Sequence, residues 1–144
     1  MRVLFDTCVI LDALQGRQVW KKEAEELFLA VANREIDGYV TAKECTDIYY
    51  MMRKYLSSEK QAISVLQAFC ELFQILDTAK EDIQKALFTD ASDFEDAVMI
   101  ETAKRENVDC ICTRNIKDYQ ASYARVFLPK DLLSVLHPSE GENR

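Results

Sequence analysis

Short apolar runs alternate along this chain with longer segments in which apolar residues recur at helical spacing. The apolar runs predict strands at residues 2–5, 39–41, 73–76, 109–113 and 126–127. The longer segments predict helices at about 17–33, 43–55, 59–72, 79–88 and 93–106, and from residue 129 onward. Strands that alternate with helices in this way predict a parallel sheet covered on both faces. We therefore expect a three-layer α/β/α domain with about five short strands.

Local signals mark where several of these elements begin. Thr78 with Glu81, and Ser92 with Glu95, have the spacing of capping boxes, which open helices. The Asp-Gly pair at residues 37–38 predicts a turn between the first long helix and the second strand. These signals set the boundaries that we expect for the central elements.

The composition is that of one globular domain. The 144 residues are 49% hydrophobic and 30% charged, which is ordinary for such a protein. We expect the domain to span residues 1–138, followed by a polar, disordered tail at 139–144. The apolar runs are too short to cross a membrane, and the first of them is broken at once by Asp6. We therefore expect a cytoplasmic protein that does not contact membranes.

Charge and cysteine content restrict the classes of function. The net charge of −7 counts against a broad basic surface for nucleic acid. Cations bound in an acidic cleft would reverse the sign locally, so a nucleic-acid substrate remains open. The five cysteines are odd in number and contain no Cys-x-x-Cys pair, which predicts reduced thiols rather than a zinc site.

Acidic residues follow three of the predicted strands. Asp6 comes directly after the first strand, and Glu44 lies in the first helical turn after the second. Asp93 and Asp96 lie at the start of a capped helix, and Asp118 follows the buried strand at 109–113. In parallel α/β folds the ligand site lies beyond the carboxyl ends of the strands, where these acids are expected.

Carboxylates gathered at one place need a cation, because like charges raise one another's pKa and destabilise the fold. Mg²⁺ or Mn²⁺ meets this need with oxygen ligands, and such ions activate phosphodiesters toward hydrolysis. The only histidine, His137, lies near the end of the chain, which argues against a histidine-based nuclease. The alternative is that these acids are solvated, or favour helix starts, as Asp93 and Glu95 would do. Position alone leaves both interpretations open.

Four ordered segments resemble the PIN-domain ribonuclease family over residues 1 to about 136. They are VLFDTCVILDAL at the start, TAKECTDIYY in the middle, DFEDAVMIETAKRENVDCICTRNIKDY later and LPKDLL near the end. The Asp-Thr start is weak by itself, whereas the ordered set of four segments is specific. The resemblance implies a five-stranded parallel sheet with a ribonuclease site at its carboxyl edge, dependent on Mg²⁺ or Mn²⁺.

The resemblance also assigns roles to individual acids. Asp6, Glu44 and Asp96 match the acidic positions of the family, and Asn115 stands where many members have Asp. That departure leaves Asp118 as the fourth acid, so we expect catalysis by these four acids and metal binding by Asp6, Asp96 and Asp118. Asp118 has an alternative role, which is to cap the short turn before Tyr119.

Three further residues are expected to ligate or support the metal, and they are Asp93, Thr113 and Asn115. Asp12 lies just beyond the first acid of the site, and we expect it to be a surface residue.

The resemblance to small stand-alone PIN toxins implies an RNA substrate and an antitoxin partner. The helix pair at residues 43–72 carries Tyr49, Tyr50, Met51 and Met52 in succession, more large apolar side chains than one helix face needs. They are either core residues or a surface for an antitoxin or a second copy of the chain. Two other functions remain: a metal-dependent phosphatase or 5′ nuclease acting on DNA, and a catalytically silent interaction module.

Overall fold

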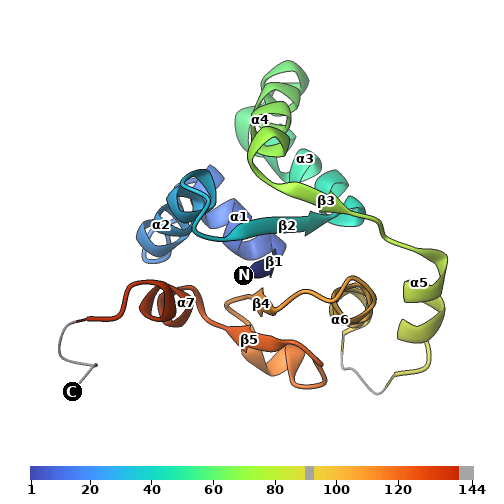
Figure 1. Cartoon of the computed structure of the whole chain (residues 1–144). Helices are drawn as coiled ribbons and strands as arrows, with labels where there is room; N and C mark the ends of the chain where they lie inside the picture. Colours follow the sequence, from blue (N-terminus) through green and yellow to red (C-terminus); the bar gives the residue numbers. More distant parts are fainter. Residues whose placement is uncertain (90–92, 140–144) are drawn as a thin grey trace.

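A computed structural model describes residues 1–89 and 93–139 and shows a five-stranded parallel sheet between helices (Figure 1). The strands are β1 (Arg2–Phe5), β2 (Asp37–Thr41), β3 (Gln74–Leu76), β4 (Cys110–Cys112) and β5 (Arg125–Phe127). Their order across the sheet is β3-β2-β1-β4-β5, and every neighbouring pair is parallel. The predicted three-layer α/β/α fold is therefore confirmed.

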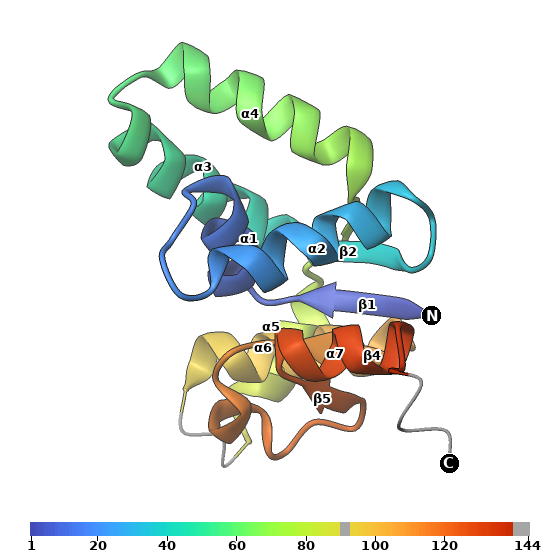
Figure 2. The same ribbon diagram turned by 90° about the vertical axis from the view of Figure 1, so that its left-hand side faces the viewer.

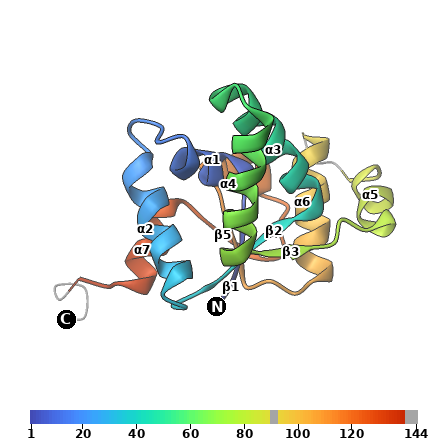
Figure 3. The ribbon, with the colours of Figure 1, turned by 90° about the horizontal axis from the view of Figure 1, so that it is seen from above.

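Helices connect the strands and cover both faces of the sheet (Figure 2). The helices are α1 (Thr7–Leu14), α2 (Lys21–Ala32), α3 (Ala42–Leu56), α4 (Glu59–Leu72), α5 (Lys80–Ala86), α6 (Phe94–Arg105) and α7 (Pro129–Leu136), with a 3-10 turn η1 (Ile116–Tyr119) before β5. Seen from above, α2 lies beside α7, and α5 lies outside α6 (Figure 3). None of these helices, within the residues described, is long and apolar enough to cross a membrane.

Alternate side chains of β1 enter two different cores. Val3 and Phe5 pack with α1, α2, α3, α4 and α7 on one face of the sheet, whereas Leu4 packs with α6 on the other. All three side chains are fully buried, as expected for a central strand covered on both faces. The start of the chain is thus fixed on both sides, and so is the residue that follows β1.

The structure corrects several sequence-based boundaries. Residues 7–14 form a separate helix, so the helix predicted from residue 17 begins only at Lys21. Between the two helices the chain turns through Gly16 and Val19, which both have positive φ angles of 61° and 79°. Residues 37–38 are not a turn: they begin β2, where Asp37 and Gly38 pair with β1.

Two predicted capping boxes are displaced by one residue. At the start of α5 the Ala79 N–H donates to Asp82 at 2.9 Å, while the Thr78 hydroxyl instead accepts from the Lys43 N–H. At the start of α6 the cap is Asp93, which accepts from the Asp96 N–H at 3.1 Å. Ser92, the predicted cap, and most of the predicted tail, 140–144, lie outside the described residues.

Gly38 is in β2 because there is no room for a larger residue. A Cβ atom at this position would lie 2.8 Å from the Phe73 ring and 2.9 Å from Val31 Cγ2. Phe73 is itself fixed, since its ring stacks on Phe69 at 4.5 Å and meets Phe5 edge-on at 5.4 Å. Close packing of a helix and an aromatic cluster against β2 therefore requires glycine.

We expect Gly38→Ala to lower the free energy of unfolding by about 1–3 kcal/mol, because a methyl group overpacks this contact. Urea denaturation measures the change. Adding Phe73→Leu should make the cost of Gly38→Ala smaller, since the smaller side chain can move away. Additive effects of the two substitutions would contradict the steric explanation.

Candidate active site

Asp6 is held at the carboxyl edge of the sheet by backbone and side-chain bonds. Its N–H donates to the Cys112 carbonyl at 2.9 Å, which extends the β1–β4 pairing by one residue. Its carboxylate accepts from the Thr113 hydroxyl at 2.7 Å and from the Cys8 thiol at 3.6 Å. The Thr113 hydroxyl in turn accepts from the Asn115 N–H at 3.0 Å. Thr113 therefore orients the Asp6 carboxylate, and its expected role in supporting a metal ion stays a prediction.

Glu44 is buried in the first turn of α3, where it completes a capping box. Its Oε1 accepts from the Thr41 N–H at 2.9 Å, and the Glu44 N–H donates to the Thr41 hydroxyl at 3.1 Å. Its Oε2 accepts from the Thr7 hydroxyl on α1 at 3.0 Å. Burial, together with the negative charge of Asp6, raises the pKa of Glu44 to about 8, although these hydrogen bonds act in the opposite direction.

Asp96 lies in the first turn of α6 and accepts a hydrogen bond from the Tyr119 hydroxyl at 3.1 Å. Burial raises the pKa of Asp96 to about 6 with the help of the charges of Asp6, Asp93 and Asp118, while the hydrogen bond from Tyr119 opposes the shift. Tyr119 is fully buried, and burial raises its pKa well above its usual value, so it remains a hydrogen-bond donor. Asp93 acts on Asp96 through charge and through its cap of the helix.

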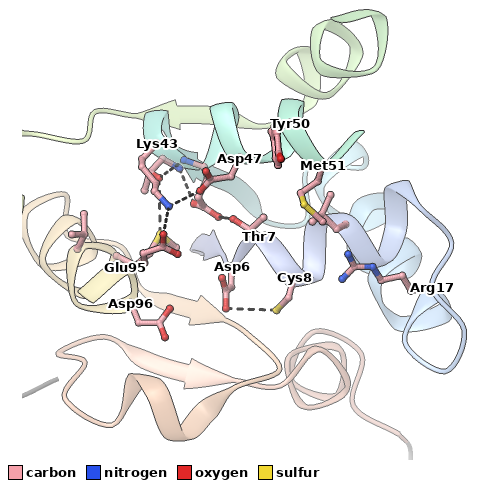
Figure 4. A pocket seen from close by; sticks show the side chains of 15 residues that line it. Asp6, Thr7, Cys8, Arg17, Lys43, Asp47, Tyr50, Met51, Glu95 and Asp96 are labelled. Atoms are coloured by element: carbon pink, nitrogen blue, oxygen red, sulfur yellow. Dashed lines mark hydrogen bonds and ion pairs between the residues drawn. The ribbon is translucent and has the colours of Figure 1, made fainter. Parts of the chain in front are cut away.

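These three acids line one cleft of about 370 Å³. In Figure 4 the carboxylates of Asp6 and Asp96 point into the same space between the end of β1 and α6. Lys43 crosses one side of the cleft, because its Nζ contacts Asp47 on α3 at 2.6 Å and Glu95 on α6 at 3.2 Å. The structure thus brings together acids from three separate parts of the sequence.

The donor set suits a hard divalent cation. Within residues 1–89 and 93–139, no three acidic, cysteine or histidine side chains approach closely enough to form a complete ligand set. Mg²⁺ does not need one, since it keeps several water ligands and uses only one or two carboxylates. Asp6, Glu44 and Asp96 supply oxygen donors whose mutual repulsion such an ion would relieve.

Asn115 and Asp118 lie outside the lining of the acidic cleft. Asn115 is exposed just beyond β4, and Asp118 is half-buried in η1. Neither lines the acidic cleft, although Asp118 lies close enough to raise the pKa of Asp96. The expected role of Asp118 in metal binding stays a prediction.

Asp12 is not the surface acid that we expected. It is fully buried, and its carboxylate accepts from Arg114 Nε at 2.7 Å and from Nη2 at 3.3 Å, with Arg17 Nη1 at 3.7 Å. The Trp20 ring covers the Arg114 guanidinium at 3.9 Å. The missed signal was the position of Asp12 in an apolar segment, VILDAL, where a surface acid has no solvent-facing helix side to occupy.

Arg17, Lys43 and Tyr119 are further site residues that sequence reasoning missed.

A family model for the PIN domain matches residues 2–117. The chain belongs to the PIN-domain family. The comparison with curated proteins gives no significant match. Among solved structures, the fold is similar to a toxin–antitoxin complex from Klebsiella pneumoniae, with a TM-score of 0.63 and 23% identity over 88% of this chain and 97% of the other.

Two further solved structures have a similar fold. FitAB bound to the IR36 DNA fragment gives a TM-score of 0.65 and 18% identity over 88% of this chain and 94% of the other. VapBC2 from Rickettsia felis, bound to a promoter DNA fragment, gives a TM-score of 0.62 and 16% identity over 89% of this chain and 98% of the other. At these identities the likeness establishes the fold of this PIN domain.

The raised pKa of Glu44 makes the stability of the metal-free PIN domain depend on pH. Ionisation is easier in the unfolded chain than in the folded one, so stability falls as pH rises from about 4.5 to about 8. The slope is at most about 1.4 kcal/mol per pH unit. We expect Glu44→Gln to flatten this decline in EDTA and to raise the melting temperature at pH 8.

Thermal denaturation across this pH range measures both effects. Added Mg²⁺ should narrow the difference between the two proteins, because the ion stabilises the ionised wild-type site. If the melting temperatures of wild type and variant differ by the same amount at pH 4.5 and at pH 8, ionisation of Glu44 does not destabilise the fold.

Proposed function

We propose that this PIN domain is a metal-dependent endoribonuclease and the toxin of a toxin–antitoxin pair. The observation that carries the proposal is the convergence of Asp6, Glu44 and Asp96 on one cleft at the carboxyl edge of the sheet. Among the similar folds, VapC20 of Mycobacterium tuberculosis is described as a sarcin-ricin loop cleaving toxin, with a TM-score of 0.61 and 10% identity. RNA is therefore the substrate that we assign to the cleft.

Asp6, Asp96 and Asp118 would hold Mg²⁺ or Mn²⁺, with Asp93, Thr113 and Asn115 in supporting positions. Bound there, such an ion supplies polarisation of the phosphodiester and stabilisation of the charge that develops on the leaving oxygen.

Neutral donors and one buried acid prepare the cleft for hydrolysis. Glu44 Oε2, held by the Thr7 hydroxyl, is a carboxylate oxygen that can accept a proton near neutral pH because its pKa is raised. Thr113 and Tyr119 orient Asp6 and Asp96 through neutral hydroxyl groups, which leaves the charge of both acids in place. Arg17 and Lys43 line the same cleft and are the cations available to RNA phosphates.

Two rival functions use the same fold. A DNA 5′ nuclease or phosphatase would use the same metal-assisted hydrolysis. Cleavage assays with single-stranded RNA, structured RNA and DNA as substrates distinguish it from a ribonuclease. A silent interaction module would bind no Mn²⁺ in calorimetry. The retention of three acids in one cleft favours an enzyme over the silent module.

We expect Asp6→Asn and Asp96→Asn each to lower RNA cleavage on the order of 100-fold or more while the fold remains intact. Cleavage of labelled RNA in Mn²⁺, with circular dichroism as a check of folding, measures this. Asp131→Asn, an exposed acid in the first turn of α7, is the matched control and should cleave normally.

The same assay separates the two candidates for the fourth position. Asp118→Asn should weaken cleavage and Mn²⁺ binding more than Asn115→Ala, because a carboxylate binds a divalent ion more strongly than an amide does. Cleavage that persists in EDTA or in the Asp6/Asp96 double variant would refute the metal mechanism.

We also propose that the α3–α4 hairpin is the surface that binds an antitoxin or a second copy of the chain. Tyr50, Tyr55 and Ile63 are exposed on this hairpin, whereas Met52 is buried and belongs to the core. Several similar folds are parts of complexes described as toxin–antitoxin or VapBC assemblies. Tyr50 also lines the acidic cleft, so a partner on this hairpin would reach the site.

We expect Tyr50→Lys to abolish co-purification with the protein encoded immediately upstream, since burial of a lysine charge in an apolar interface is unfavourable. Leu29→Lys on α2 is the matched control, because this side chain is also exposed and apolar but lies elsewhere. Size-exclusion chromatography measures the complex. A monomeric wild type that binds no such protein would contradict the assignment.

A further inference from the structure

A second cavity, of about 290 Å³, lies between the start of α2 and the start of α7, on a side of the molecule where these two helices run together (Figure 3). The acidic cleft and its mechanism do not use it. Aromatic, apolar and basic side chains and one acidic side chain form its walls: Val19, Trp20, Glu23, Arg114, Leu128, Pro129 and Lys130.

Trp20 and Arg114 form a fixed platform in this cavity. The Arg114 guanidinium lies 3.9 Å from the Trp20 ring centroid, and the buried Asp12 carboxylate binds it through two nitrogens at 2.7 and 3.3 Å. An arginine held by a carboxylate and an aromatic ring cannot change its orientation without breaking these contacts. The indole that rests on it is therefore oriented in advance, although 44% of the Trp20 surface remains exposed.

The residue before this platform has an unusual backbone. Val19 has a φ of 79° and is 83% exposed. A β-branched residue rarely adopts the left-handed region, and an exposed one gains no packing in return. The conformation turns the chain so that Trp20 lies over Arg114, and strain of this kind is typical of binding sites.

The same buried carboxylate joins the cavity to the acidic cleft. Asp12 pairs with Arg114, which lines the cavity, and with Arg17, which lines the cleft. One carboxylate faces two guanidinium groups, so this connection carries a net positive charge, and the exposed Lys130 in the cavity offsets the negative charge of Glu23 there. A polyanion that enters the acidic cleft thus has a basic path to the cavity in a chain whose net charge is −7.

We propose that this cavity binds a nucleotide of the single-stranded RNA substrate next to the phosphodiester in the acidic cleft. The proposal rests on the ribonuclease function and extends it with a second binding position. A base stacks on the exposed Trp20 ring, while Arg114 and Lys130 contact the phosphates beside it. Stacking on an aromatic ring beside basic groups is how proteins bind single strands without reading a fixed sequence.

The chain offers a direct readout, because Trp20 is its only tryptophan. A short single-stranded RNA is titrated at low salt into the protein in EDTA, and into the Asp96→Asn variant in Mg²⁺. We expect saturable quenching of Trp20 fluorescence in both cases. In fluorescence anisotropy, Trp20→Ala should weaken RNA binding about fivefold or more, and Trp20→Phe should lose less. Lys130→Glu should weaken binding and reduce its dependence on salt.

Tyr123→Ala is the matched control, because Tyr123 is an exposed aromatic that also pairs with a cation, Lys104, at 5.0 Å. It should bind RNA as the wild type does. Normal RNA cleavage and binding by Trp20→Ala, without quenching in the wild type, would overturn the proposed cavity and leave the ribonuclease function standing. Quenching without cleavage in Mn²⁺ would support the cavity and contradict the ribonuclease. Quenching by a bound protein partner but by no RNA would also overturn it.

Discussion

Repulsion between the carboxylates of Asp6, Glu44 and Asp96 is the constraint on which the site depends. Within the described residues, none of these three acids pairs with a lysine or arginine. Hydroxyl and backbone groups hold them instead, so their positions are fixed while their charges remain uncompensated. Burial and repulsion then raise the pKa of Glu44 and Asp96. Without a metal ion these shifts favour the protonated form of Glu44 at neutral pH, whereas a bound cation would favour its ionised form.

The nearby cations have other partners. Lys43 contacts Asp47 and Glu95, and Arg17 and Arg114 share the buried carboxylate of Asp12. The Asp12 pairing also joins α1 to the loop that follows β4, next to the threonine that orients Asp6. The buried ion pair therefore holds α1 against the loop that follows β4, and it connects the acidic cleft to the Trp20 cavity. Its removal would leave a guanidinium without its buried partner.

Sequence patterning was sufficient for the fold and for the expectation that Asp6, Glu44 and Asp96 lie at the carboxyl edge of the sheet. The apolar runs located all five strands, of which the central strands β1, β2 and β4 are largely buried and the edge strands β3 and β5 are more exposed. Local caps were less predictable, since a helix start can use any of several adjacent polar residues: Asp82, in place of the predicted Glu81, accepts from the N–H of the cap residue of α5. Gly38 was taken for a turn because the space filled by Phe73 is not visible in the sequence.

The sequence by itself determined the layered α/β fold and the positions of Asp6, Glu44 and Asp96 at helix starts and strand ends. These features follow from periodicity and from the rule that parallel strands end at one edge. Only the tertiary structure decided that Asp12 is buried against Arg114 and that Trp20 covers the guanidinium. Those contacts join residues about a hundred positions apart, and long-range pairs depend on how helices pack rather than on any local pattern.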